Sequence, residues 1–241
     1  MRFIALILSL ILFVSISNAA VIRGKVRLRK KGAFPSKNPY VYNGFRTELK
    51  FSKWKWMRNF ESTRLKDYTD STDTIIYLSH IPDQYKRKET PNQEPIKIHI
   101  NSASFHVKTL PIMTGSTLEF INHDPVAHDI YSFSATKPFE TQFFQNRHAF
   151  VTFKKPGGVT IRSSIYKNMR TEILVLDHPY FTKPRKDGTY HMRNLRPGVY
   201  QISAWHPEFP TITKEVEVNY GETITIDFNM ATMGLPKALV K

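Results

Sequence analysis

The stretch that decides the fold reads NHDPVAHDIYSFS over residues 122–134, and it is followed by PGGVTIRSSIYKNM over residues 156–169. In both segments a turn rich in Pro, Gly, Asn or Asp leads into a short run that alternates between apolar and polar residues. Such runs, bounded by turn residues, predict short β-strands with one buried face.

The same pattern recurs along the chain, and it predicts an all-β protein. Apolar or alternating runs are separated by turn residues at regular spacing, and no amphipathic helical pattern of useful length is present. This arrangement is typical of β-sandwiches and barrels. We expect strands at 21–28, 74–78, 96–100, 104–113, 116–122, 149–153, 158–163, 171–176, 216–218 and 223–228.

The two segments resemble the cupredoxin-like proteins of the methylamine-utilisation or plastocyanin-like type. The family pattern is N-x-D-x-x-x-H, then S-x-S-x-x-x-x-F, then G-x-V-x-x-x-C-x-I-H-x-x-M, and here His128, Ile165 and Met169 match it. Ser163 stands where the family has Cys, and Tyr166 stands where it has its second His. The resemblance covers about 74–176, with the run at 21–28 as the expected first strand. It implies a Greek-key β-sandwich with a remnant of a copper site.

The two replacements argue against blue-copper chemistry. A blue-copper centre needs two imidazoles, one thiolate and a weak axial thioether. The hydroxyl of Ser163 and the phenol of Tyr166 are poor ligands for copper, which leaves only His128 and Met169. We therefore expect no resident cofactor, with copper at these two residues as the alternative. His99, His106, His123 and Asp124 are further donors that such a metal site could recruit, and Met169 could equally be a core side chain.

A second pattern begins at Asp177. The motifs DGTY at 187–190 and LRPGVY at 195–200 resemble the carboxypeptidase-regulatory-like, or transthyretin-like, β-sandwich. The unit is short, so it is expected to pack on the preceding domain. The sequence thus predicts a signal peptide at 1–20, a cupredoxin-like domain at 21–176 with an insertion at 29–72, a carboxypeptidase-regulatory-like domain at 177–230, and a tail at 231–241.

The N-terminus indicates export. Arg2 is followed by an apolar run at 3–14 and by small residues, so cleavage is expected near Ala19 or Ala20. We therefore predict a periplasmic or secreted bacterial protein with no transmembrane segment after cleavage. The chain has no Cys, which excludes disulfides, thiolate metal sites and thiol catalysis. Its formal charge of +15 falls to +14 when Arg2 is removed, and a basic chain is attracted to acidic surfaces.

The insertion at 29–72 is a candidate binding surface, because cations alternate there with aromatic residues. Such a mixture suits membrane interfaces, saccharides and single-stranded nucleic acid. Export makes nucleic acid an unexpected partner, and the aromatic rings could instead cover a sheet. The candidate residues are Lys50, Lys53, Trp54, Lys55, Trp56 and Arg58.

The sequence carries none of the catalytic fingerprints of hydrolases, metalloproteases, P-loop or dinucleotide-binding enzymes. We therefore expect a non-enzymatic binding or structural protein of the cell envelope on a degenerate cupredoxin scaffold. One alternative is a metal-binding or redox protein that uses His128 and Met169. The other is an envelope adhesin that binds an anionic polymer through the basic aromatic insertion. The partner is an unidentified protein or such a polymer.

Overall fold

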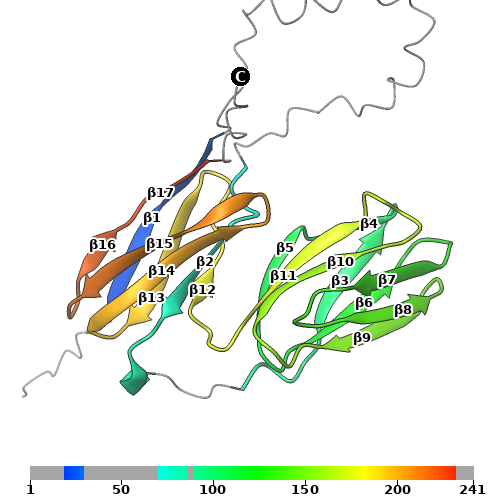
Figure 1. Ribbon diagram of the computed structural model, residues 1–241, viewed down its shortest axis with the longest axis horizontal. Helices are drawn as coiled ribbons and strands as arrows, with labels where there is room; N and C mark the ends of the chain where they lie inside the picture. Colours follow the sequence, from blue (N-terminus) through cyan, green and yellow to red (C-terminus); the bar gives the residue numbers. More distant parts are fainter. Residues whose placement is uncertain (1–18, 30–69, 86–89, 232–241) are drawn as a thin grey trace, which may run out of the picture.

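The structure is a computed structural model that describes residues 19–29, 70–85 and 90–231. These residues form two β-sandwiches side by side (Figure 1), so the predicted all-β sandwich fold is confirmed. A short 3-10 helix, η3 (Asp83–Tyr85), follows the second strand. No helix within the described ranges is long and apolar enough to cross a membrane.

The first body, here called the central sandwich, is continuous in sequence. One of its sheets has the strand order β4-β3-β6-β9 and the other has the order β5-β11-β10-β7-β8. Its strands are β3 (Ile96–Asn101), β4 (Ser104–Phe105), β5 (Thr109–Met113), β6 (Thr117–Asn122), β7 (His128–Ser132), β8 (Phe139–Phe143), β9 (His148–Thr152), β10 (Gly157–Arg162) and β11 (Arg170–Leu176).

The second body, the split sandwich, takes strands from both sides of the central sandwich in sequence. Its sheets have the orders β13-β1-β16, with β17 also paired to β1, and β12-β2-β14-β15. Its strands are β1 (Ala20–Arg29), β2 (Ile75–His80), β12 (Phe181–Thr182), β13 (Thr189–Leu195), β14 (Gly198–His206), β15 (Phe209–Val218), β16 (Thr223–Thr225) and β17 (Phe228–Ala231). The central sandwich is thus inserted between β2 and β12.

This topology corrects the expected place of the first strands. We expected 21–28 and 74–78 in the cupredoxin-like domain, but β1 is antiparallel to β13 and parallel to β16 and β17. Strand β2 likewise pairs with β14 and β12. The alternating pattern of 21–28 identified a strand with one buried face, but it could not identify the sheet that the strand joins. The two strands were therefore assigned to the wrong sandwich.

Each sandwich has its own core, and a small third cluster joins the two bodies. Tyr190 and Phe228 are buried in the split sandwich, and Phe120 and Phe153 are buried in the central one. At the junction, Ile75, Leu174 and Leu176 are buried against Tyr77, Phe181 and Trp205. A polar link accompanies this contact, because the Lys183 ammonium donates to the backbone oxygen of Thr109 at 2.7 Å.

Candidate functional site

The residues at the four ligand positions of the cupredoxin-like pattern come from two neighbouring segments of the central sandwich. His128 begins β7, whereas Ser163, Tyr166 and Met169 lie in the loop between β10 and β11. The rings of His128 and Tyr166 pack with centroids 5.0 Å apart. The loop closes on itself, because the Ser163 N–H donates to the Met169 backbone oxygen at 3.3 Å. Met169 is buried in the central core, against which Tyr166 packs.

The hydroxyl of Ser163 is fully occupied by hydrogen bonds that hold the loop. It donates to Asp129 Oδ1 at 2.8 Å and accepts from the N–H groups of Ile165 and Tyr166 at 3.2 and 3.1 Å. One donation and two acceptances exhaust a hydroxyl. Burial acts to raise the pKa of the Asp129 carboxyl, but hydrogen bonds from Ser164 and Ser163 outweigh it, so that pKa lies below its usual value.

His128 has a different environment on its two ring nitrogens. Nε2 lies 2.8 Å from Asp124 Oδ2, and that carboxylate also accepts the N–H groups of Ser102 and Ala103. Burial would raise the Asp124 pKa, but the bonds from Ala103, Ser102 and His128 outweigh it and lower that pKa. An ionised carboxylate only accepts, so we assign the proton to Nε2. In the neutral imidazole the lone pair then lies on Nδ1, which is buried without a hydrogen-bond partner among the described residues.

The spacing between Asn122 and His128 has a structural cause in the loop between β6 and β7. The Asn122 amide donates to the Val126 backbone oxygen at 2.7 Å, and its carbonyl accepts the Asp124 N–H at 2.9 Å. Asn122 is fully buried. These bonds fix the loop, and the loop in turn places Asp124 against His128.

The residues at these positions do not fit a blue-copper centre. Such a centre requires a thiolate where Ser163 stands, and the Ser163 hydroxyl is already committed to Asp129 and two backbone groups. Within the described part of the chain, no three His, Asp or Glu side chains are arranged to hold a metal ion. What remains of the pattern is the free Nδ1 of His128 and the buried thioether of Met169.

Three of the four additional donors considered from the sequence form a hydrogen-bonded cluster near the surface, namely His99, His106 and His123. His99 Nδ1 lies 2.8 Å from His123 Nε2, and the His99 N–H donates to His106 Nδ1 at 2.9 Å. Burial, followed by the charges of His106 and His123, lowers the pKa of His99. Each of these histidines is thus hydrogen-bonded to another of the three, whereas the fourth donor, Asp124, bonds to His128. The six residues of the basic aromatic insertion (Lys50, Lys53, Trp54, Lys55, Trp56 and Arg58) lie outside the described residues, so that surface remains a prediction.

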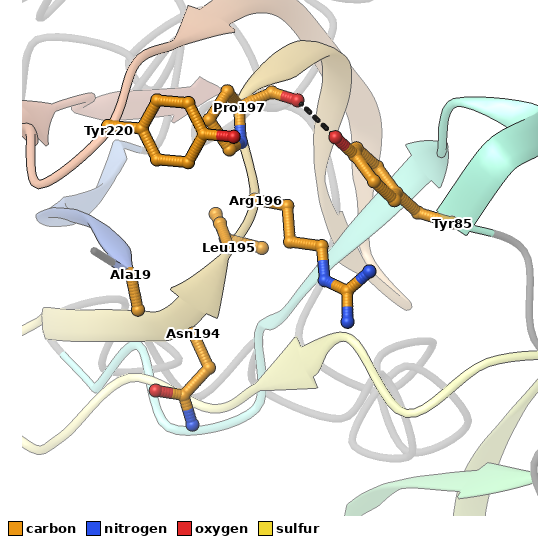
Figure 2. A pocket seen from close by; sticks show the side chains of 7 residues that line it. All are labelled: Ala19, Tyr85, Asn194, Leu195, Arg196, Pro197 and Tyr220. Atoms are coloured by element: carbon orange, nitrogen blue, oxygen red, sulfur yellow. Dashed lines mark hydrogen bonds between the residues drawn. The ribbon is translucent and has the colours of Figure 1, made fainter. Parts of the chain in front are cut away.

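A pocket of about 450 Å³ opens on the split sandwich, and sequence reasoning did not find it (Figure 2). It is formed by the turn between β13 and β14 together with side chains from η3 and from the turn after β15. Its lining residues are Ala19, Tyr85, Asn194, Leu195, Arg196, Pro197 and Tyr220. The LRPGVY motif supported only a family resemblance, and nothing in it showed which distant residues would face Arg196 and Pro197.

Comparison with known families gives one match, over residues 166–226. It is the fn3-like family described as polysaccharide lyase family 4, domain II, and it covers about a quarter of the chain. The match overlaps the unit for which we expected a carboxypeptidase-regulatory-like domain, yet it carries another description. That finer assignment is therefore unsupported and remains a prediction. No curated protein matches the chain in sequence.

Similar solved structures include several cupredoxins. A copper-containing nitrite reductase (NirK) from Thermus scotoductus SA-01 is 28% identical, with a TM-score of 0.33, and the match covers 34% of this chain and 22% of that one. A reduced mutant of amicyanin is 16% identical, with a TM-score of 0.32, and the match covers 35% of this chain and 84% of that one. A purple cupredoxin from Nitrosopumilus maritimus is 19% identical, with a TM-score of 0.30, and the match covers 34% of this chain and 99% of that one. This chain thus spans only about a fifth of the nitrite reductase.

Proposed function

We propose that this chain is a secreted, non-enzymatic binding or structural protein of the cell envelope, on a cupredoxin-like scaffold without blue-copper chemistry. The observation that carries the proposal is the hydrogen bonding of Ser163. At the position where the pattern has a metal thiolate, this residue ties its own loop to the Asp129 carboxylate. The position therefore serves the stability of the fold.

An anionic polymer is the ligand class that the chain's charge favours. The formal charge of +15 attracts acidic surfaces by long-range electrostatics. The family match at residues 166–226 is to a module described from polysaccharide lyases, which supports a saccharide polymer over a lipid surface. The basic aromatic insertion and the pocket of the split sandwich are the two places where such a polymer would bind.

One observation favours a second candidate, the binding of a soft metal ion at His128. Its Nδ1 is buried and unpartnered among the described residues, and Asp124 orients the ring through Nε2. Metal-binding imidazoles are commonly oriented by a carboxylate in this way. Together with the Met169 thioether, Nδ1 would offer Cu(I) one nitrogen and one sulfur ligand.

Two measurements on the purified signal-free protein test the proposal. A competitive titration with Cu(I) and Cu(II), run beside His128→Ala, should show no binding above that of the variant. Stoichiometric binding that His128→Ala abolishes would instead establish the second candidate. Retention on an immobilised acidic polysaccharide should fall steeply with salt, since screening weakens exposed charge pairs. Equal retention on a neutral polysaccharide would contradict the proposed ligand class.

A further inference from the structure

We infer that the pocket of the split sandwich binds a uronate unit of an acidic polysaccharide, with the Arg196 guanidinium on its carboxylate. The inference rests on the proposed function and names the part of the polymer that is recognised and the residues that recognise it. The pocket volume of about 450 Å³ lies within the range of about 300–1,000 Å³ that is usual for small-ligand sites.

The charge of the pocket selects an anion. Arg196 is the one charged side chain among the described residues that line the pocket, and none of those residues places a carboxylate beside it. Its guanidinium lies 5.5 Å from the centroid of the Tyr85 ring. Among the described residues it forms no ion pair. A guanidinium presents a planar fork of N–H donors that matches a carboxylate with two parallel hydrogen bonds.

The turn that carries Arg196 is held by phenols from two other places. Tyr85 donates to the backbone oxygen of Pro197 at 2.9 Å (Figure 2), and Tyr200 donates to the backbone oxygen of Arg196 at 2.8 Å. Tyr200 is itself buried in the core of the split sandwich. Two successive carbonyl groups of the turn are thus fixed before a ligand arrives. Such preorganisation lowers the entropy that binding would otherwise cost.

The remaining lining residues favour a saccharide over a simple anion. Tyr220 is 73% exposed and lines the pocket (Figure 2), so its ring offers an apolar face to a ligand. The Asn194 side chain forms no hydrogen bond within the described part of the chain, so its donors and acceptor remain available for hydroxyl groups. Phosphate or sulfate would use the Arg196 guanidinium and the Asn194 amide, but neither anion has an apolar face to place against Tyr220. A uronate supplies a carboxylate, hydroxyl groups and the C–H face of a sugar ring.

The test is calorimetric titration of the chain from Ala19 onward, which keeps the whole pocket lining, with a short alginate oligomer in which every ring carries a carboxylate. A malto-oligomer of the same length is the neutral ligand, and inorganic phosphate is the simple anion. The variants are Arg196→Gln and Tyr220→Ser. Arg193→Gln is the matched control, because it removes the same charge from an exposed position on β13 outside the pocket lining.

We expect Arg196→Gln to weaken alginate binding at least tenfold, Tyr220→Ser to weaken it several-fold, and Arg193→Gln to leave it within about twofold. Unchanged circular dichroism would establish that the variants fold. If Arg196→Gln binds as well as Arg193→Gln, the pocket assignment is wrong while the proposed function stands. The assignment also fails if inorganic phosphate binds the protein as tightly as the alginate oligomer does. If the unmodified protein binds neither the oligomer nor immobilised acidic polymer, both the assignment and the proposed ligand class fail.

Discussion

Replacing Ser163 with Ala should destabilise the protein by about 2 kcal/mol. The change removes the hydroxyl that donates to Asp129 Oδ1 at 2.8 Å. Asp129 is only 8% exposed, so water cannot easily replace that donor. A hydrogen bond to a charged group contributes about 1.5–3 kcal/mol to stability. Asp129 keeps the N–H of Ser164, and Ile165 is exposed enough for water to replace its lost partner. The estimate therefore stays near the middle of that range.

Equilibrium urea unfolding followed by circular dichroism would measure this loss. With a slope of about 2 kcal/mol per molar urea, about 2 kcal/mol lowers the midpoint by about 1 M. Ser104→Ala is the control, because its exposed hydroxyl has a single contact of 3.5 Å with the Phe105 backbone oxygen. That variant should change stability by less than about 0.5 kcal/mol. An equally small loss for Ser163→Ala would refute the structural role assigned to this position.

Three other sets of measurements test the close approach at Gly24, the Asp129 carboxylate and the positions of the lost copper ligands. Gly24→Ala should abolish folding of the split sandwich, because the new Cβ would lie 1.7 Å from the Ile226 backbone oxygen. Gly158→Ala is the control, because no described atom beyond its chain neighbours lies within 4 Å of its Cβ. Circular dichroism should show that only the control variant remains folded. The lowered pKa of Asp129 stabilises the fold above the unfolded pKa of about 3.9, and this contribution is lost as pH falls through the folded pKa. Urea midpoints from neutral pH to about pH 3 should therefore fall less steeply in Asp129→Asn than in the unmodified protein, and parallel slopes would argue against the role of this carboxylate. Ser163→Cys combined with Tyr166→His should create a copper site with a thiolate-to-copper absorption band, which Ser163→Cys with His128→Ala should lack.

Local pattern predicted most strands of the central sandwich, but the expected strand at 104–113 is two strands, β4 and β5, and β7 and β8 were not among the expected strands. The expected run at 96–100 is β3 (Ile96–Asn101), and the run at 171–176 is β11 (Arg170–Leu176). These runs are short and end at polar or turn residues, so the alternation and the flanking turn residues indicate the same strand boundaries. In β3 the side chains of Ile98 and Ile100 are buried while Lys97 is exposed, as alternation requires.

Sheet membership was not predictable in the same way. An alternating pattern fixes which face of a strand is buried, but any sheet with a suitable partner can bury it. The run at 21–28 did contain one informative residue, Gly24, since glycine inside a strand often marks a close approach of another backbone. The Tyr190 ring and the Ile226 carbonyl do come close there, and the Tyr190 hydroxyl donates to that carbonyl at 2.7 Å. One sequence alone could not show which backbone approaches.

The residues of the candidate site could be predicted from the sequence, but their contacts could not. Resemblance identified His128, Ser163, Tyr166 and Met169 as equivalent positions, but hydrogen bonding depends on neighbours that the pattern does not mention. The bond between Ser163 and Asp129 joins residues 34 positions apart. The pocket residues Tyr85, Arg196 and Tyr220 are also far apart in sequence, and no motif links them. Both features arise from chain topology, which fixes distances that local pattern leaves free.

The contacts of Ser163 also explain how a loop of this kind can dispense with a metal. A thiolate cannot donate a hydrogen bond and a thiol donates only weakly, so a Cys at this position would give Asp129 Oδ1 a weaker donor than the Ser163 hydroxyl, or none. A copper thiolate would offset that loss only while the metal is bound, because ligand binding stabilises the folded state by mass action. Ser supplies the donor permanently and accepts the same two backbone N–H groups. The loop is therefore held by the Ser163 and Asp129 side chains, and within the described ranges the buried Nδ1 of His128 has no hydrogen-bond partner.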